Sequence, residues 1–221
     1  MTVLSSRDCA VSVGGVPVSM ADEATTDLGA HTEYQITADS KRAIDPASAV
    51  AVKVNGSAVG STTYAVDYAH GIVTFSSAQN PAHAVVVSGK YVPLLALAET
   101  RTARIVRPHP VMADSTRLGD TATRQTEIAR KCSVTLEHLT TSATDLGDTT
   151  TLGAMYAGGL LFVAATLGTG DGVLRGWFCP TAATPAHSLD DLLVTTVQLD
   201  GVVQTCVGRP ATDQAIFSIR Y

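Results

Sequence analysis

Short runs of alternating polar and apolar residues, each ended by a turn signal, recur along most of this 221-residue chain. The run at 49–54 ends at Asn55-Gly56, a dipeptide typical of tight hairpin turns. The runs at 62–67 and 72–75 flank a second turn that contains Gly71. About a dozen such runs, with turns every ~8–12 residues, predict an all-β fold: a β-sandwich or barrel of two packed antiparallel sheets.

Two of the predicted strands exceed the usual strand length of about 5–6 residues. The first, 94–106, alternates until Arg107-Pro108-His109-Pro110, which we predict ends it. The second is 121–139, and residues 114–120 between the two have the composition of a loop. The two strands therefore form one extended hairpin in our interpretation. Their long edges are a hazard for a monomer but could pair with a neighbouring copy in an assembly.

One short α-helix is predicted to flank the sheets. The segment 141–158 places Leu152, Met155 and Tyr156 at helical spacing, and the glycine pair at 158–159 can stop it.

The chain also divides by composition. The segment 5–30 opens with a β-like run and then becomes polar, which indicates an arm or long loop over a surface rather than a core element. We therefore expect an N-terminal arm at 1–32 and a β-sandwich domain at 33–221. Within that domain, 33–91 reads as a hairpin-rich inserted or decorating module.

Charge is scarce in this sequence. Only 16% of the residues are charged, against about a quarter in typical soluble proteins, while 45% are hydrophobic. Two explanations fit: a surface partly buried against partners, or the small-residue bias of a high-GC genome. The net charge of −5 and the presence of only four lysines argue against a surface that grips nucleic-acid phosphates.

The cysteines and the apolar runs bear on the compartment. Cys9, Cys132, Cys179 and Cys206 show no C-x-x-C spacing, so they predict buried thiols rather than a zinc site. No signal peptide is evident at the N-terminus, and the longest apolar run, 160–167, is too short to span a bilayer. We expect synthesis in a reducing cytoplasm and no membrane association.

No pattern of catalytic or cofactor-binding residues emerges. The glycine-rich run 168–172 precedes a strand-like segment instead of a helix, so it predicts a hairpin turn and not a phosphate loop. Asp190 and Asp191 are neighbours on a predicted strand and point to opposite faces. Asn55-Gly56-Ser57 matches a glycosylation sequon but is better explained as a turn. The six histidines lack the spacing of metal ligands. We predict no catalytic, cofactor-binding or metal-binding residues.

Several basic residues fall on or near the two long strands. They could pair with the acidic arm of a neighbouring copy, face a channel, or simply lie on a solvated strand face. These residues are Arg101, Arg104, Arg107, Arg124, Arg130 and Lys131.

The order of elements after Thr126 carries a family resemblance. A long strand at 126–139 precedes a short helix at 149–157, and a hairpin runs through the glycine-rich turn 168–172 into 173–179. A loop predicted at 180–188 leads to the run 190–201, which ends in a predicted turn at Asp200-Gly201. This order resembles the major tail tube proteins of long-tailed, non-contractile bacteriophages. The segment 64–75 also resembles a β-hairpin frequent in phage structural proteins.

The resemblance implies a structural virion protein without enzyme activity. Six copies would form a ring, and the rings would stack through the N-terminal arm and the loop at 114–123. The tube would surround a tape-measure protein, contact tail terminator and distal tail proteins, and conduct DNA without binding it specifically. It would be assembled in the bacterial host cytoplasm.

Other functions stay open at this point. The large 33–91 module also fits a neck or tail-completion protein. The fold class alone fits a carbohydrate-binding or adhesin module, or a metal enzyme on a cupin-like scaffold.

Overall fold

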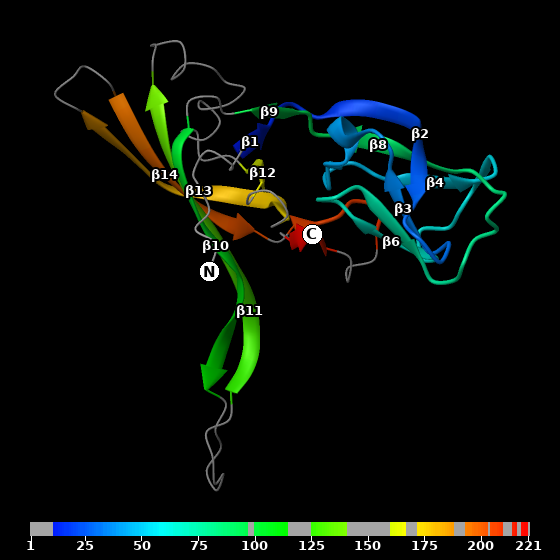
Figure 1. The fold of residues 1–221 in the computed structure, drawn as a ribbon. Helices are drawn as coiled ribbons and strands as arrows, with labels where there is room; N and C mark the ends of the chain where they lie inside the picture. The colour runs from blue at the N-terminus through cyan, green and yellow to red at the C-terminus, as the bar shows by residue number, and fades with distance from the viewer. Residues whose placement is uncertain are drawn as a thin grey trace, which may run out of the picture.

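A computed structural model describes most of the chain in terms of β-strands (Figure 1). The described residues are 11–96, 100–114, 125–140, 160–166, 172–187, 193–202, 204–209, 214–215 and 218–220. They form two antiparallel sheets, one short strand pair and a single 3₁₀ turn at Asp39–Lys41, which confirms the all-β class. The helix predicted at 141–158 lies outside the described residues.

The larger sheet has eight strands and collects the C-terminal half of the chain. Its order is β10-β11-β14-β13-β12-β1-β9, with β17 beside β13. The strands are β1 (Val11–Gly14), β9 (Leu94–Ala96), β10 (Thr100–Asp114), β11 (Gln125–Thr140), β12 (Leu161–Thr166), β13 (Val173–His187), β14 (Leu193–Val202) and β17 (Ser218–Arg220).

The smaller sheet has seven strands, all from the N-terminal half of the chain. We call this sheet, together with the core packed against it, the small unit. Its order is β5-β4-β8-β2-β3-β7-β6. The strands are β2 (Val18–Asp27), β3 (Glu33–Ile36), β4 (Ala51–Val54), β5 (Ser57–Ala58), β6 (Tyr64–Asp67), β7 (Ile72–Phe75) and β8 (Val85–Tyr91). A separate pair joins β15 (Gln204–Thr205) to β16 (Gln214–Ala215).

The large sheet is rolled. Its end strands, β9 and β10, are consecutive in the chain, and only three residues join them. Ala96 and Thr100 therefore lie at most about 14 Å apart. The sheet has to curl until its two edges approach each other, so it is barrel-like rather than flat.

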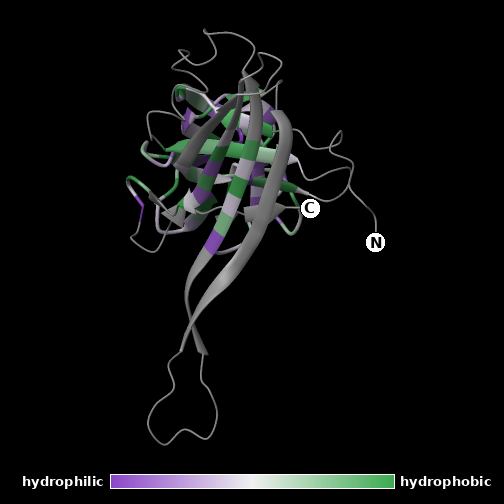
Figure 2. Ribbon diagram, turned by 90° about the vertical axis from the view of Figure 1, so that its left-hand side faces the viewer, coloured by the Kyte–Doolittle hydropathy of each residue, from purple (hydrophilic) through white to green (hydrophobic). Residues whose placement is uncertain are grey.

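The inner face of the rolled sheet forms one core. Side chains alternate along a strand, so every second residue of β11 points inward: Cys132, Val134 and Leu136 are buried, and Lys131 is exposed. This alternation is visible along β11 in Figure 2. The described members of this core are Val11, Val13, Cys132, Val134, Leu136, Leu161, Val163, Ala165, Leu174, Phe178, Val197 and Leu199.

A bulge in β2 turns the corner of the small unit. The N-terminal part of β2 pairs with β8 and its C-terminal part pairs with β3, with a register shift between Met20 and Glu23. Asp22 lies at this shift with a φ of 50°. Its carboxylate accepts hydrogen bonds from Lys53 (2.9 and 3.0 Å) and Ser88 (3.0 Å), and the Lys53 bond is the main reason that the pKa of Asp22 is lowered. Such bulges bend a strand and re-aim its side chains.

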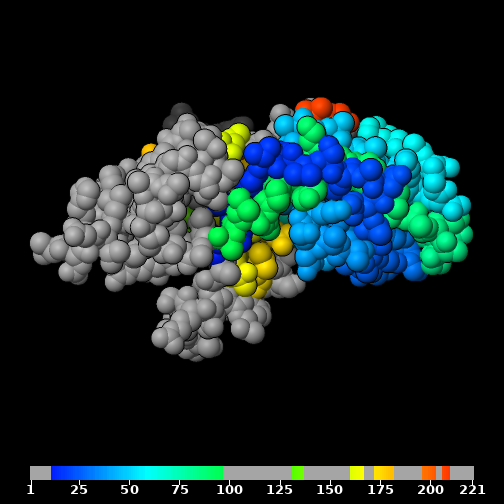
Figure 3. Space-filling model, turned by 90° about the horizontal axis from the view of Figure 1, so that it is seen from above, coloured from blue at the N-terminus to red at the C-terminus, as the bar shows by residue number. Residues whose placement is uncertain are grey.

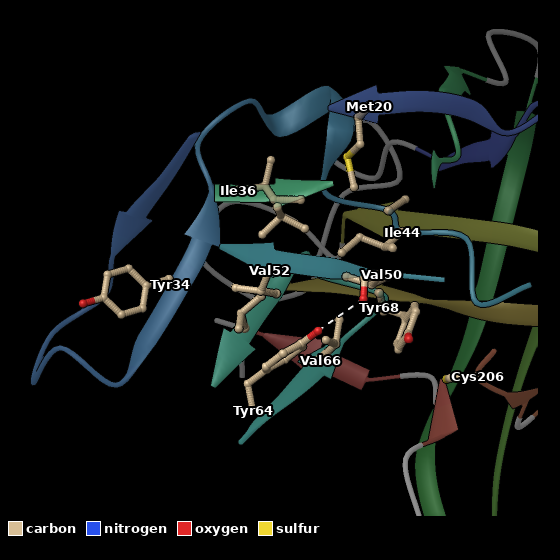
Figure 4. Close-up of a cluster of buried hydrophobic side chains, with 14 of the residues drawn as sticks. Met20, Tyr34, Ile36, Ile44, Val50, Val52, Tyr64, Val66, Tyr68 and Cys206 are labelled. Carbon is tan, nitrogen blue, oxygen red and sulfur yellow. Dashed lines mark hydrogen bonds between the residues drawn. The ribbon is translucent and has the colours of Figure 1, made fainter. Parts of the chain in front are cut away.

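The core of the small unit extends across to the outer face of the large sheet. Met20, Ile36, Val52 and other side chains of the small unit converge in Figure 4, where the Tyr64 hydroxyl donates to the Val50 carbonyl at 3.2 Å. The large sheet adds Phe162 and Trp177, paired edge to face with ring centroids 4.2 Å apart.

The β-like run that opens the segment 5–30 is confirmed, but the expectation that this segment is an arm or long loop outside the core is wrong for its described strands. Residues 11–14 and 18–27 are β1 and β2, and Val13 is completely buried. The polar composition of β2 misled the prediction because only Met20 on that strand is buried, so main-chain pairing rather than an apolar stripe places it. The division of the chain at residues 32 and 33 stays a prediction.

The chain passes between the large sheet and the small unit at two adjacent places, from β1 to β2 and from β8 to β9. In Figure 3, β1 and β2 run beside β8 and β9, and the Gly15 N–H donates to the Pro93 carbonyl at 2.8 Å between them. Gly14 is needed here because a Cβ would come within 2.5 Å of Val92 Cγ1 and 2.8 Å of Phe162 Cβ.

Gly14→Ala should lower the free energy of unfolding by about 1–3 kcal/mol, the usual cost of forcing an extra carbon into a packed core. The matched control is Gly15→Ala, whose added Cβ meets nothing closer than 3.5 Å and should change stability by at most about 0.5 kcal/mol. Urea denaturation of both variants tests this; equal stabilities would contradict it.

Candidate assembly interface

A two-stranded ribbon projects from the large sheet. Residues 133–138 of β11 lie between β10 and β14, whereas 125–132 have only β10 as a described partner. At about 3.3 Å per residue, these eight residues carry the ribbon about 25 Å beyond the third strand. Figure 1 shows β10 and β11 leaving the body together. The predicted extended hairpin is therefore confirmed.

The predicted end of the first strand at Pro108 and Pro110 is wrong. β10 continues through both prolines to Asp114, with a register shift between Val106 and His109. Proline interrupts a central strand because it lacks an N–H, but an edge strand needs hydrogen bonds on one side only. β10 is an end strand of the sheet order, so it accommodates both prolines.

β13 is a second strand that continues through prolines where the sequence predicted its end. Residues 180–188 read as a loop, yet β13 runs to His187 and includes Pro180 and Pro185. Beyond Phe178 the described pairing partner of β13 is β14 alone, with a register shift after Pro180. The turn predicted at Asp200-Gly201 is also absent, since β14 runs through these residues to Val202.

Residues 206–209 contact the small unit, and we call these contacts the Arg209 clasp. The Val207 N–H donates to the Pro46 carbonyl at 3.0 Å, and buried Cys206 belongs to the core of the small unit. The Arg209 guanidinium donates to the carbonyls of Ser61 and Tyr64 and lies 4.4 Å from the centre of the Tyr64 ring. These contacts link residues that are far apart in the chain and hold the small unit against the large sheet.

Arg209→Gln removes both guanidinium contacts and the cation–π contact, so it should destabilise the protein by about 1–3 kcal/mol. Lys90→Gln is the charge-matched control, because it removes one positive charge from an exposed strand position. Chemical denaturation measures the effect of each. If the two variants were equally stable, the clasp would contribute nothing.

Cys132 marks the base of the ribbon. Its side chain is 2% exposed, and burial raises the pKa of its thiol from 9.0 to about 12. The reactive thiolate is therefore suppressed in the folded protein at ordinary pH. Cys179 on β13 is only partly buried.

Iodoacetamide should label Cys132 far more slowly than Cys179 at pH 8, as peptide mass spectrometry can show. The folded thiol holds its proton more tightly, so its contribution to stability is complete below pH 9. That contribution should fall as the pH rises from 9 towards 12. Comparable labelling of both cysteines in folded protein would contradict this burial.

The other candidate sites of the sequence are turns or are not brought together. Asn55 and Gly56 form the predicted tight turn, with φ values of 50° and 79°. The residues after the glycine-rich run form β13, which pairs with β12, so the hairpin prediction is confirmed. Asp190 and Asp191, and all but the last residue of the glycine-rich run, lie outside the described residues.

Two of the histidines each contact a nearby aspartate. Nδ1 of buried His70 lies 3.2 Å from Oδ2 of Asp67, and His31 contacts Asp27. Within the described residues, no three His, Cys, Asp or Glu side chains gather where they could hold a metal ion. The prediction that the chain has no catalytic or metal site stays a prediction.

The basic residues of the long strands are partly located. Arg101, Arg104 and Arg107 lie on β10, and Arg130 and exposed Lys131 on β11, while Arg124 lies outside the described residues. Their pairing with an acidic arm stays a prediction. The long strand edges were expected from the sequence, but the Arg209 contacts were missed. The sequence analysis also missed which stretches are edges, although prolines inside an alternating pattern were an available signal.

Comparison with known proteins gives limited sequence similarity. No protein-family model matches the chain. A stretch of 54 residues is 41% identical to the Na(+)/H(+) antiporter NhaA 2 of Mycolicibacterium vanbaalenii, and covers 24% of this chain and 12% of that protein. No helix among the described residues is long and apolar enough to cross a membrane.

Two solved structures are similar to part of this chain at low TM-score. A chain from the tail of an empty GTA particle, computed with helical refinement and C6 symmetry, has a TM-score of 0.41 and 15% identity. The match covers 58% of this chain and 87% of that one. A chain from the virion of a native gene transfer agent particle has a TM-score of 0.40 and 15% identity. That match covers 58% of this chain and 89% of the other. At these TM-scores the likeness carries no functional argument, so function has to be inferred from the chain's own strands.

Proposed function

We propose that the chain is a structural subunit of a phage-like tail, and specifically a tube subunit that polymerises as stacked rings. The ribbon of β10 and β11 carries this proposal. It continues about 25 Å past its last described neighbouring strand, and long strand edges without a partner are a hazard for a protein that works alone.

The ribbon needs a partner on physical grounds. An isolated pair of strands is marginally stable in water, and a third strand or a packed face is required for independent stability. A neighbouring copy can supply either, since it presents open strand edges of its own. The scarcity of charge in the sequence agrees with extensive burial between copies.

The finer features of the proposal come from the family resemblance. Six copies form a ring, the tube encloses a tape-measure protein, and tail terminator and distal tail proteins contact its ends. The net charge of −5 suits a conduit through which DNA slides without binding. The site of action is then the virion tail.

The small unit favours one alternative, a neck or tail-completion protein, because it is more than a minimal tube subunit needs. A carbohydrate-binding module has less support. Such modules present aromatic rings for stacking, but of the eight aromatic residues that the structure describes, seven are buried, Trp177 among them, and Tyr91 is partly buried.

Concentrated purified protein should form rings or tubes visible by negative-stain electron microscopy. A variant in which Asn-Gly replaces 110–130 should keep the folded body but lose assembly. This replacement joins His109 to Lys131, which face each other across the hairpin, so a two-residue turn fits there.

A second variant tests the predicted inter-ring loop independently of the ribbon. Replacing 115–124 by Asn-Gly joins Asp114 to Gln125, also opposed, and keeps the whole ribbon. It should form rings but shorter stacks, because the predicted inter-ring loop is lost. Wild-type protein that stays monomeric at every concentration, or a ribbonless variant that assembles normally, would contradict the proposal.

A further inference from the structure

The prolines of this protein mark the open edges of the large sheet. Four of the nine prolines lie inside described strands: Pro108 and Pro110 in β10, and Pro180 and Pro185 in β13. All four fall on stretches that have a described partner strand on one side only. Proline is tolerated in such a stretch when its nitrogen faces away from the partner.

A proline on an open edge changes what the edge can bind. A strand that adds to a sheet needs the outward N–H groups, and these come from every second residue. Pro108 and Pro110 have no N–H to offer, and the register shift between Val106 and His109 further distorts this part of β10. Prolines and bulges are devices by which proteins block edge-to-edge pairing.

The opposite edge of the ribbon has no proline. Residues 125–132 of β11 pair with β10 on one side, and no described strand pairs with them on the other. One register shift, beside Ala129, interrupts the stretch, and all of its residues keep their N–H groups. The ribbon therefore has one edge that can accept a strand and one that cannot.

We infer that a second copy of the chain adds a strand to β11 at 125–132, while the prolines keep the edge stretches that carry them, around 108–110 and 180–185, from pairing. This inference rests on the proposed tail-tube function and specifies its contact. The second copy can offer 102–106 of its own β10, which is regular, proline-free and open in the described structure. Because the two surfaces differ, the contact is head-to-tail, the type that closes rings or extends tubes.

Hydrogen exchange with peptide mass spectrometry tests this on the unmodified protein. Amides of 125–132 should exchange at least about tenfold more slowly in assembled than in dilute protein, since outward N–H groups become bonded. Peptides covering 108–114 serve as the internal control and should change little.

The outcomes separate the two proposals. Assembled protein with unchanged exchange at 125–132 would overturn the β11 contact and leave the tail function standing. Protein that never assembles would overturn both.

A proline variant tests the blocking role even in unassembled protein. Pro108→Thr with Pro110→Thr restores two N–H groups to the edge, so it should increase irregular self-association in sedimentation velocity. Pro81→Ala, at an exposed turn, is the matched control. A double variant as monodisperse as the control would show that the prolines block nothing.

Discussion

The fold depends on the burial of β12 on both faces. Five consecutive residues, Leu161 to Ala165, are buried, because alternate side chains enter the two different cores. Leu161 and Val163 fill the inside of the rolled sheet, while Phe162 packs on Trp177 and joins the core of the small unit. Each fully buried side chain of this kind contributes about 1.5–3 kcal/mol, so this single strand couples the stability of the two parts.

The ribbon has fewer stabilising contacts than the two parts that β12 couples. The two chain crossings and the Arg209 clasp fix the small unit at one end of the large sheet. The other end of the sheet continues into the ribbon, where residues 125–132 of β11 have β10 as their only described partner strand. The contact that is missing from a single chain is thus concentrated where the main-chain edges are open, and a neighbouring copy can supply it there.

The sequence predicts this fold where local chemistry decides the structure. Asn55-Gly56 specifies a tight turn by its backbone preference, and the alternation at 64–75 specifies a hairpin. It fails where position in the sheet overrides local preference. Pro108 ends a strand by local rules but is accommodated on an edge, and polar β2 is held by pairing with strands far away in the sequence. The Arg209 clasp could not be predicted, because it joins residues almost 150 positions apart.

The hydrogen-bonding capacity of the strand edges therefore supports the proposed assembly more than charge does. The ion pair of Lys53 with Asp22 lies within the small unit, and both side chains are partly exposed, where such a pair contributes little. On the large sheet, the arrangement of N–H donors decides which edge can bind. A strand that carries prolines at one edge, opposite a strand that carries none, gives the ribbon a polarity. In the proposed assembly, that polarity favours a head-to-tail contact over a symmetric pair, so growth would proceed in one direction rather than stop at a dimer.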